Sequence, residues 1–524
     1  MYCPKDVLSM MVNTYYIAPS KSLTAIKLAI TDKFMSQAKQ AHTLVRTHLD
    51  TLDWRLHKNG YRLAYEHPRE EPPLQLRKLS NDEIVSQADC TTLPSTPRQI
   101  GAGKLRTLIT PILQERALAF QIQQKVTQHT INIHNKSGKT IAVIQLETIR
   151  HLAPMAQRSL IKCLHYNAIK GYEKENQGIK KFLDKHPALS IADTSELTNL
   201  IEHFNIDTNA FNGKPRFTLA PDARTDGSAK NILSSFAQNM ELNTPGVIED
   251  IDPECVHDFR IAVRRTRTLL GQVTNIFPAK RLQSAKTYFA RLGAITTPLR
   301  DLDVMLMNFD DYRSLLPINM QQDLDSAYQY MDQQRAVAYK AVKQHLQSKR
   351  HQNYMDSWKV FLESDVPENT TLNNAKRPAK EIADRRIWKA YTKLIKQGSA
   401  INDDSPPDDL HTLRKSSKKL RYLLEFFQSL YPKKKIKATI RTLKTLQDLL
   451  GEYQDLHVHI DFFDDLYNAM QRDQLLGAKT AAALIQVNKA LDVEQLECRK
   501  QFEARFKQFN SKSHNKEFKG LFLS

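Results

Sequence analysis

Residues 256–270 read VHDFRIAVRRTRTLL, and residues 410–424 read LHTLRKSSKKLRYLL. The two stretches carry histidine, basic and apolar residues in the same order, 154 positions apart, which is the separation of His257 and His411. The same offset relates RDLDV at 300–304 to QDLHV at 454–458, so the register holds without an insertion. A repeat of this kind predicts two copies of one helical unit.

Each stretch divides into a basic face and an apolar face when it is placed on an α-helix. At about 100° per residue, the histidine and the cations three, seven and ten positions later fall within roughly a quarter turn of one another. Apolar side chains fall on the opposite side, and they are Phe259, Val263, Leu269 and Leu270 in the first copy and Leu413, Leu420, Leu423 and Leu424 in the second. The basic face comprises His257, Arg260, Arg264 and Arg267 in the first copy and His411, Arg414, Lys418 and Arg421 in the second, where Lys415 and Lys419 flank it.

The two basic faces predict an anionic ligand. Clustered cations on one helix repel each other by about a few tenths of a kcal/mol per pair, so a basic stripe without counter-charge costs stability. A single basic helix is more often a solvated surface, but two matched copies with histidine at the same place favour a shared role. Arginine binds phosphate oxygens through paired hydrogen bonds and lysine acts as a mobile point charge, which suits a polymer of phosphates. Further cations at helical spacing extend the predicted surface, namely Lys389, Lys393, Lys437, Arg441 and Lys444.

The composition is that of a soluble globular protein with a basic surface. The 524 residues include 76 Lys+Arg and 57 Asp+Glu, a net charge of +19 that suits a polyanion or an acidic membrane surface. We find no secretory signal pattern and no apolar run of about 18 residues, so we expect no membrane insertion and a cytoplasmic location. Five scattered cysteines predict neither a disulfide framework nor a zinc site, and we expect no metal and no cofactor.

The chain is long enough for more than one domain, because single cores seldom exceed roughly 250–300 residues. Strand-like runs predict strands at 23–30, 61–65, 74–79, 130–134 and 140–146, and the last two are joined as a hairpin across 136–139. Beyond about Leu160 the strand signals fade and the pattern becomes helical. We therefore predict an α+β domain at 1–221 and an all-α domain at 222–524, with repeats at about 228–375 and 376–515.

The region from about 228 to 515 resembles the CHAD domain, the conserved-histidine α-helical domain. The resemblance is carried by the two histidine-bearing helices, with Arg265 and Tyr422 included in the match, and by the segment 300–304. It implies two four-helix bundles related by a pseudo-two-fold axis around a basic groove. It also implies that the groove binds inorganic polyphosphate, and that the protein resides on polyphosphate granules.

The region from about 20 to 220 resembles, in degraded form, the CYTH domain, whose antiparallel β barrel forms a triphosphate tunnel. The likeness is carried by 49–56, by 60–63 and by a closing basic segment at 211–219. The family's Glu-x-Glu-x-Lys signature on the first strand is replaced, in this alignment, by Leu23, Ala25 and Lys27, so both metal-holding acids are missing. The resemblance therefore implies a non-catalytic module, whose remaining cations for anion contact are Lys27, Arg62, Arg77 and Lys78.

Three classes of function stay open. The leading prediction is a non-catalytic protein that binds inorganic polyphosphate. One alternative is a tunnel-type inorganic triphosphatase acting on tripolyphosphate, which the missing acids disfavour. The other is a nucleic-acid-binding protein, which is disfavoured because Tyr422 is the one aromatic candidate for base stacking beside the basic faces. The sequence does not indicate an oligomeric state.

Overall fold

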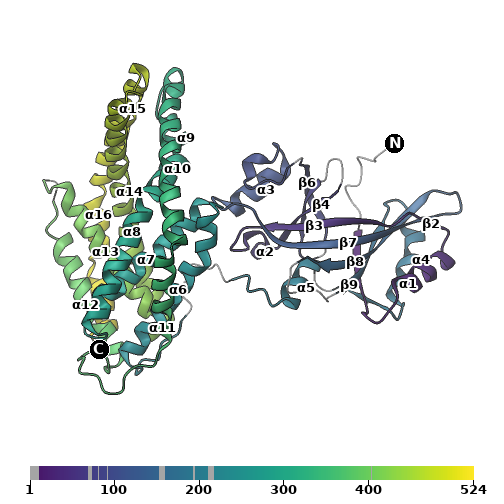
Figure 1. The fold of residues 1–524 in the computed structure, drawn as a ribbon, viewed down its shortest axis with the longest axis horizontal. Helices are drawn as coiled ribbons and strands as arrows, with labels where there is room; N and C mark the ends of the chain where they lie inside the picture. The colour runs from purple at the N-terminus through teal and green to yellow at the C-terminus, as the bar shows by residue number, and fades with distance from the viewer. Residues whose placement is uncertain are drawn as a thin grey trace. The chain divides into compact units, whose positions relative to one another are not determined.

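The computed structural model describes residues 11–68, 73–80, 82–90, 92–152, 160–192, 195–209, 217–402 and 404–523. The chain divides into two compact units, Met1–Asn212 and Gly213–Ser524. The first unit is rich in strands and the second is helical, as Figure 1 shows. The predicted order of an α+β part followed by an all-α part is confirmed.

The first unit is built around a ten-stranded antiparallel sheet. We call this unit the β unit. Its strands are β1 (Met11–Ile17), β2 (Ser36–Ala38), β3 (His42–Asp50), β4 (Tyr61–His67), β5 (Pro73–Lys78), β6 (Ile84–Asp89), β7 (Ala119–His134), β8 (Thr140–His151), β9 (Leu160–Ala168) and β10 (Leu189–Ile191). They lie in the order β10-β1-β9-β8-β7-β3-β4-β5-β6, and β2 also pairs with β7. The helices of this unit are α1 (Leu23–Lys33), α2 (Arg55–Lys58), α3 (Lys104–Leu113), α4 (Glu173–Asp184) and α5 (Glu196–His203).

Both faces of the central strands are buried, and they differ in chemistry. In β9, Leu164 and Tyr166 belong to an apolar core that also contains Ile30 of α1 and Leu183 of α4. The alternate residues Cys163 and His165 are also buried but point to the other side of the strand. That second side, which we call the polar face, also carries buried polar side chains, namely Arg46, His48, Gln124, Gln128 and Glu147.

The sequence-based assignment of the β unit is partly confirmed. The hairpin across 136–139 is present, since the Asn135 N–H donates to the Lys139 carbonyl between β7 and β8. The strand expected at 23–30 is wrong, because these residues begin α1 and bury Ile26 and Ile30 one turn apart. The expected loss of strands beyond Leu160 is also wrong, because β9 and β10 follow. Residues 211–216 of the expected closing segment lie outside the described residues.

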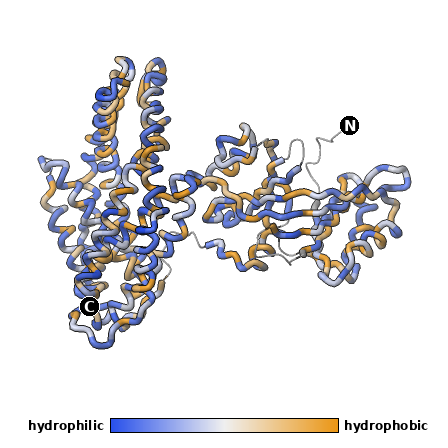
Figure 2. Tube along the Cα trace, in the orientation of Figure 1, coloured by the Kyte–Doolittle hydropathy of each residue, from blue (hydrophilic) through white to orange (hydrophobic). Residues whose placement is uncertain are grey.

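The helical unit contains long helices joined by short loops. They are α6 (Thr225–Ile248), α7 (Pro253–Gln272), α8 (Ala279–Met307), α9 (Phe309–Ser314), α10 (Asp325–Gln347), α11 (Lys349–Glu363), α12 (Ala379–Gly398), α13 (Pro407–Phe427), α14 (Lys433–Arg472), α15 (Ala478–Lys500), α16 (Phe502–Phe509) and α17 (Lys512–Phe522). Figure 2 shows hydrophobic and hydrophilic positions interleaved along these helices, as expected where each buries one face. Within the described ranges, every helix is either too short or too polar to span a membrane.

The internal repeat is visible in where the helices begin. α6 and α12 begin at residues 225 and 379, α7 and α13 at 253 and 407, and α8 and α14 at 279 and 433, so each pair is offset by the same 154 positions. The halves then diverge. Asn308 separates α8 from α9, whereas α14 runs unbroken through the matching position for 40 residues.

One apolar core is built from both halves of the helical unit. Met305, Phe309 and Met331 from the first half pack in one cluster with Phe463 and Leu484 from the second. The helices that contribute these residues are α8, α9, α10, α14 and α15, which Figure 1 shows running alongside one another. We call this cluster the shared core, because neither half forms it alone.

Candidate functional site

The two histidine-bearing helices, α7 and α13, begin at Pro253 and Pro407, four residues before His257 and His411. Asp252 caps α7, its carboxylate accepting a hydrogen bond from the Cys255 N–H at 2.8 Å, and Pro253 occupies the first turn. α13 likewise begins with Pro407, and Asp408 and Asp409 lie in its first turn, where negative charge is favourable. The eight apolar residues assigned to the far side of the two helices are all buried. The basic faces therefore point away from the apolar cores.

Arg260 of α7 is held against α8. Its Nη1 donates to the carbonyl of Gly293 at 3.0 Å and to the hydroxyls of Thr296 and Thr297, each at 2.9 Å. Burial, together with the neighbouring charges of Arg264, Arg300 and Arg267, lowers the pKa of Arg260, although Asp301 acts in the opposite direction. Arg260 thus fixes the α7–α8 contact and also contributes its charge to a cationic region.

The space beside Arg267 depends on a glycine. A Cβ at Gly293 of α8 would lie 3.1 Å from the Arg267 Nη1, so a larger residue would push the guanidinium outward. Arg300, also on α8, donates to the Pro253 carbonyl at 3.3 Å and lies 3.6 Å from a Glu254 oxygen. α8 therefore supports the basic face of α7 at several points.

In the second half, α14 supports the basic face of α13 in a similar way. Arg414 donates to Asp455 at 2.7 Å, and Nδ1 of His411 hydrogen-bonds with the side-chain oxygen of Gln454. Asp455 occupies the repeat position of Asp301, which is 154 residues earlier. Each half thus places one carboxylate beside the first arginine of its basic face.

Cations of the two halves lie close to one another. The charge of Arg264 on α7 lowers the pKa of both Arg414 and Lys418 on α13, in addition to the larger effect of burial. For Lys418, burial and the charges of Arg414, Arg264 and Arg421 lower the pKa to about 8, against the opposing effect of Asp455. We call the resulting group the basic cluster, and it consists of Arg260, Arg264, Arg267, Arg300, Arg414, Lys418 and Arg421.

Two residues of the predicted site carry internal contacts. Arg265 donates to Glu425 at 3.1 Å, and Arg421 donates to the same carboxylate group at 2.7 Å, so Glu425 connects α7 with α13.

His257 is half-buried in the second turn of α7. The remaining predicted cations are exposed on α12, α13 and α14, and they are Lys389, Lys393, Lys415, Lys419, Lys437, Arg441 and Lys444.

Two residues that support the cluster were not predicted from the sequence. Arg300 lies in the 300–304 match but is not among the predicted site residues, and neither is Glu425. The repeat alignment held a usable signal, because Arg300 and Gln454 occupy matching positions next to the histidine-bearing helices. Asp303 pairs with Arg335 of α10 at 2.7 Å, so it does not contribute to the cluster.

The cations expected to contact anions in the β unit have protein partners or lie elsewhere. Arg62 is buried and donates to both oxygens of Asp82, at 2.5 and 2.6 Å, and Lys78 pairs with Glu83 at 2.9 Å. Arg77 donates to Gln75. Lys27 lies on α1, so its assignment to the first strand, with Leu23 and Ala25, is wrong. The first described strand, β1, reads MVNTYYI and carries no acid.

A family model supports the assignment made for the helical half. The model described as the CHAD domain matches residues 231–464, which include α7, α8, α12 and α13 in full. No curated protein matches the chain.

Among solved structures, the chain is similar to the CHAD domain from the plant Ricinus communis, with 24% identity over 57% of this chain and 96% of that chain and a TM-score of 0.48. It is similar to PptA from Streptomyces chartreusis, with 15% identity over 54% of this chain and 100% of that chain and a TM-score of 0.43. The putative adenylyl cyclase HpAC1 from Hippeastrum, described as having a dominant triphosphatase activity, shows 11% identity over 37% of this chain and 96% of that chain, with a TM-score of 0.28. The family model is the most informative of these comparisons, because it spans the residues that build the basic cluster: the CHAD domain model matches residues 231–464 of this chain.

Proposed function

We propose that the helical unit binds inorganic polyphosphate at the basic cluster. The observation that carries the proposal is the approach of Arg264 to Arg414 and Lys418, which brings like charges from both halves together. Like charges at short range destabilise the folded protein unless counter-charge is supplied. Four acids beside the seven cations supply only part of it, and they are Asp301, Asp455, Glu254 and Glu425. A bound polyanion would supply the rest.

The arrangement favours a polymer over a single phosphate. The cluster is assembled from three helices, α7, α8 and α13, rather than from one loop. It combines arginines, which can grip two oxygens at once, with Lys418, which can follow a moving oxygen. The exposed cations on α12 and α14 would extend the contact along the chain of phosphates. Residence on polyphosphate granules and a cytoplasmic location are parts of the same proposal.

The decisive test uses calorimetric titration of the full chain with long-chain polyphosphate at about 0.15 M salt, where screening suppresses weak surface attraction. The test variant carries Arg264→Glu and Lys418→Glu, which reverse charge in the cluster without removing the Arg260 contacts to α8. The matched control carries Lys433→Glu and Lys434→Glu, which change the net charge equally at an exposed helix start. Each charge-assisted contact contributes about 1.5–3 kcal/mol, so the test variant should bind at least about 100-fold more weakly.

The control separates a site from diffuse attraction. We expect the Lys433/Lys434 variant to bind within about threefold of the original protein, since surface charges are largely screened at this salt. Equal losses in the two variants would contradict the proposal. Competition between polyphosphate and single-stranded RNA at matched salt tests the nucleic-acid alternative. Tighter binding of the RNA would identify nucleic acid, and not polyphosphate, as the ligand.

We further propose that the protein does not hydrolyse phosphate chains. The absence of acids from β1 and the pairing of Arg62 with Asp82 support this view. Purified protein incubated with tripolyphosphate and Mg²⁺ or Mn²⁺ should release no phosphate above background. Metal-dependent release that copurifies with the protein through every step would establish the triphosphatase alternative.

A further inference from the structure

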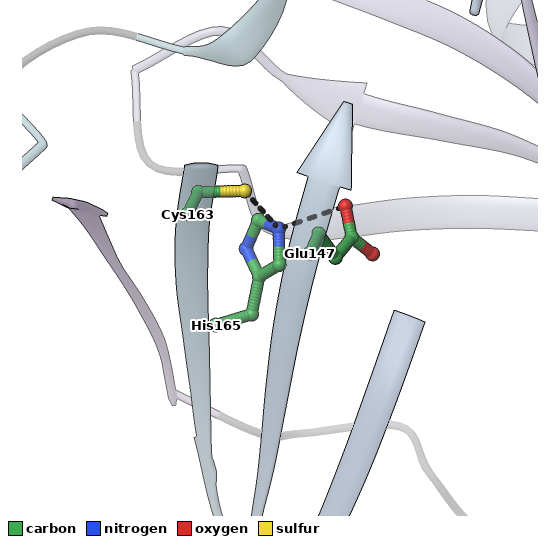
Figure 3. A group of neighbouring side chains, drawn as sticks. All are labelled: Glu147, Cys163 and His165. Carbon is green, nitrogen blue, oxygen red and sulfur yellow. Dashed lines mark hydrogen bonds and ion pairs between the residues drawn. The ribbon is translucent and has the colours of Figure 1, made fainter. Parts of the chain in front are cut away.

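Three side chains with metal-binding chemistry meet on the polar face of the β unit. Glu147 of β8 lies directly across from Cys163 of β9 in the strand register, and His165 follows two residues later on the same face. All three are buried. Figure 3 shows the imidazole of His165 between the Cys163 sulfur and the Glu147 carboxylate. In the sequence, Cys163 and His165 lie two positions apart, a spacing on which the expectation of no metal site did not depend.

The separations of the three groups match those of metal ligands. The His165 Nε2 lies 3.4 Å from the Cys163 Sγ and 3.4 Å from a Glu147 oxygen, and the ligand atoms of all three residues lie within 4.8 Å of one another. Zinc bonds of about 2.3 Å to sulfur and about 2.0–2.2 Å to nitrogen and oxygen, arranged tetrahedrally, separate neighbouring ligand atoms by about 3.4–3.6 Å. An ion can therefore enter with little movement of the side chains.

The surrounding hydrogen bonds hold two of the ligands in a binding geometry. The hydroxyl of Thr14 lies 3.0 Å from the His165 Nδ1, and a proton on Nδ1 leaves the Nε2 lone pair facing sulfur and carboxylate. The Glu147 carboxylate is fixed by Arg46, at 2.9 Å to each oxygen, and by Gln128 at 2.7 Å. Metal-ligating imidazoles and carboxylates characteristically have such outer partners.

The charge of the polar face provides a second, independent indication. Arg46 pairs with three carboxylates at once, those of Glu66, Glu147 and Glu196, at 2.7–2.9 Å. Of the Glu196 carboxylate, one oxygen, Oε1, is buried and has no hydrogen-bond partner in the described structure. An unpaired carboxylate oxygen inside a protein is costly unless a cation or a donor meets it.

The arginines and carboxylates of the polar face also indicate that a cation could bind there. Arg62 is matched by Asp82, and Arg77 adds one positive charge nearby. The three guanidinium groups therefore face four carboxylates, so this buried face carries one excess negative charge when His165 is neutral.

We propose that Glu147, Cys163 and His165 bind one divalent transition-metal ion, most suitably Zn²⁺. The thiol of Cys163 loses its proton to solvent as the Zn–S bond forms, and no electron is transferred. The mixture of sulfur, nitrogen and oxygen donors selects zinc or cobalt over Mg²⁺ and Ca²⁺, which prefer oxygen alone. Three protein ligands leave a fourth position for water, and the ion would tie β8 and β9 together.

The test uses the full chain, stripped of metal by a chelator and freed of phosphate polymers, and titrated with Co²⁺. We expect one Co²⁺ per chain, with a thiolate-to-cobalt absorption band in the near ultraviolet and intense tetrahedral bands in the visible that Zn²⁺ abolishes on addition. This measurement needs no variant. A titration without the thiolate band would overturn the proposal and leave the three residues as a hydrogen-bonded core.

Matched variants assign the thiolate. Cys163→Ser should lose the thiolate band, whereas Cys90→Ser, which changes another buried cysteine of the same unit, should keep it. Thermal unfolding of the stripped proteins checks that both variants fold. Glu147→Gln removes a ligand and should weaken Co²⁺ binding by at least about tenfold, the loss that removing even an outer partner of a metal ligand causes. A thiolate band that persists in Cys163→Ser would place the metal elsewhere and contradict the assignment.

Discussion

Arg265 on α7 donates to Glu425 on α13 at 3.1 Å, and only 13% of each side chain is exposed. These two residues belong to different halves of the repeat, 160 positions apart. The ion pair therefore fixes the position of α7 relative to α13, the two helices that carry most of the basic cluster. Glu425 is the acceptor on which that placement depends, since Arg421 also donates to it.

Replacing Arg265 should destabilise the helical unit. Arg265→Met leaves Glu425 buried with one cationic partner instead of two, and breaking a buried pair costs about 3–5 kcal/mol, reduced here toward about 2 kcal/mol because Arg421 remains. Equilibrium urea unfolding followed by circular dichroism measures the loss. The control is Arg377→Met, whose partner Glu381 is half exposed, so the loss should be below about 0.5 kcal/mol. Equal losses in unfolding free energy for the two changes would show that the Arg265–Glu425 pair stabilises the protein no more than an exposed ion pair does.

Polyphosphate binding should take up protons near pH 8. Burial and neighbouring cations lower the pKa of Lys418 to about 8, so roughly half of the free protein carries a neutral amine there. A bound polyanion favours the charged form and raises this pKa, which draws a proton from solution. Affinity should fall as pH rises through 8 and 9. Calorimetry in two buffers of different ionisation enthalpy measures the uptake, and Lys418→Arg, which stays charged, should abolish it.

Two glycines on helices should respond to alanine in opposite directions. A Cβ at Gly398 of α12 would meet the ring of Phe506 at 2.0 Å, so Gly398→Ala should destabilise the protein by about 1–3 kcal/mol. At Gly451 of α14 the added Cβ meets nothing within 4 Å, and Gly451→Ala should stabilise the helix by about 0.5–1 kcal/mol. Thermal unfolding monitors both. A stabilising Gly398→Ala would mean that Phe506 can move aside without cost.

Removing Arg46 should destabilise the β unit most strongly at neutral pH. Burial pushes the pKa of Glu147 upward, but the charge of Arg46 and its hydrogen bonds hold this pKa well below its ordinary value. In the original protein this stabilisation is present above about pH 4.5 and is lost as pH falls through the depressed pKa. Arg46→Met should cost about 3–5 kcal/mol at pH 7, because the carboxylates lose their partner.

The pH dependence of this variant provides its internal check. Without Arg46 the buried carboxylates should have raised pKa values, so lowering the pH protonates them and removes the penalty. The difference in unfolding free energy between the variant and the original protein should therefore shrink from pH 7 toward pH 5. A difference that stays constant over this range would show that packing, not charge, causes the loss.

The repeat made the helical half predictable from sequence. The offset of His257 and His411 set the register, and the helix starts at 253 and 407 follow it. Amphipathic spacing predicted which side of each helix is buried. The contact between Arg265 and Glu425 could not be predicted, because it depends on how two distant helices cross. Nor could spacing alone show that Arg260 would donate hydrogen bonds to the hydroxyls of Thr296 and Thr297 of α8.

The β unit was harder to predict, and the reason lies in its polar face. Cys163 and His165 alternate with Leu164 and Tyr166, but all four are buried, so the alternation does not separate inside from outside. The strand prediction for 23–30 is wrong, because β-branched residues such as Thr24 and Ile26 favour strands although Ile26 and Ile30 have helical spacing. Partnerships within the polar face, such as Arg46 with Glu147 and Glu196, join residues up to 150 positions apart.

The shared core has a consequence for how the two halves depend on each other. Phe309 and Met331 from one half need Phe463 and Leu484 from the other, so a protein containing a single half would expose a large apolar surface. Such a fragment would need a second copy to cover that surface. Because the two halves are joined in one polypeptide, the two histidine-bearing helices need not be identical. The paired histidines keep the symmetry of the repeat, whereas the arginine-rich α7 and the lysine-rich α13 depart from it.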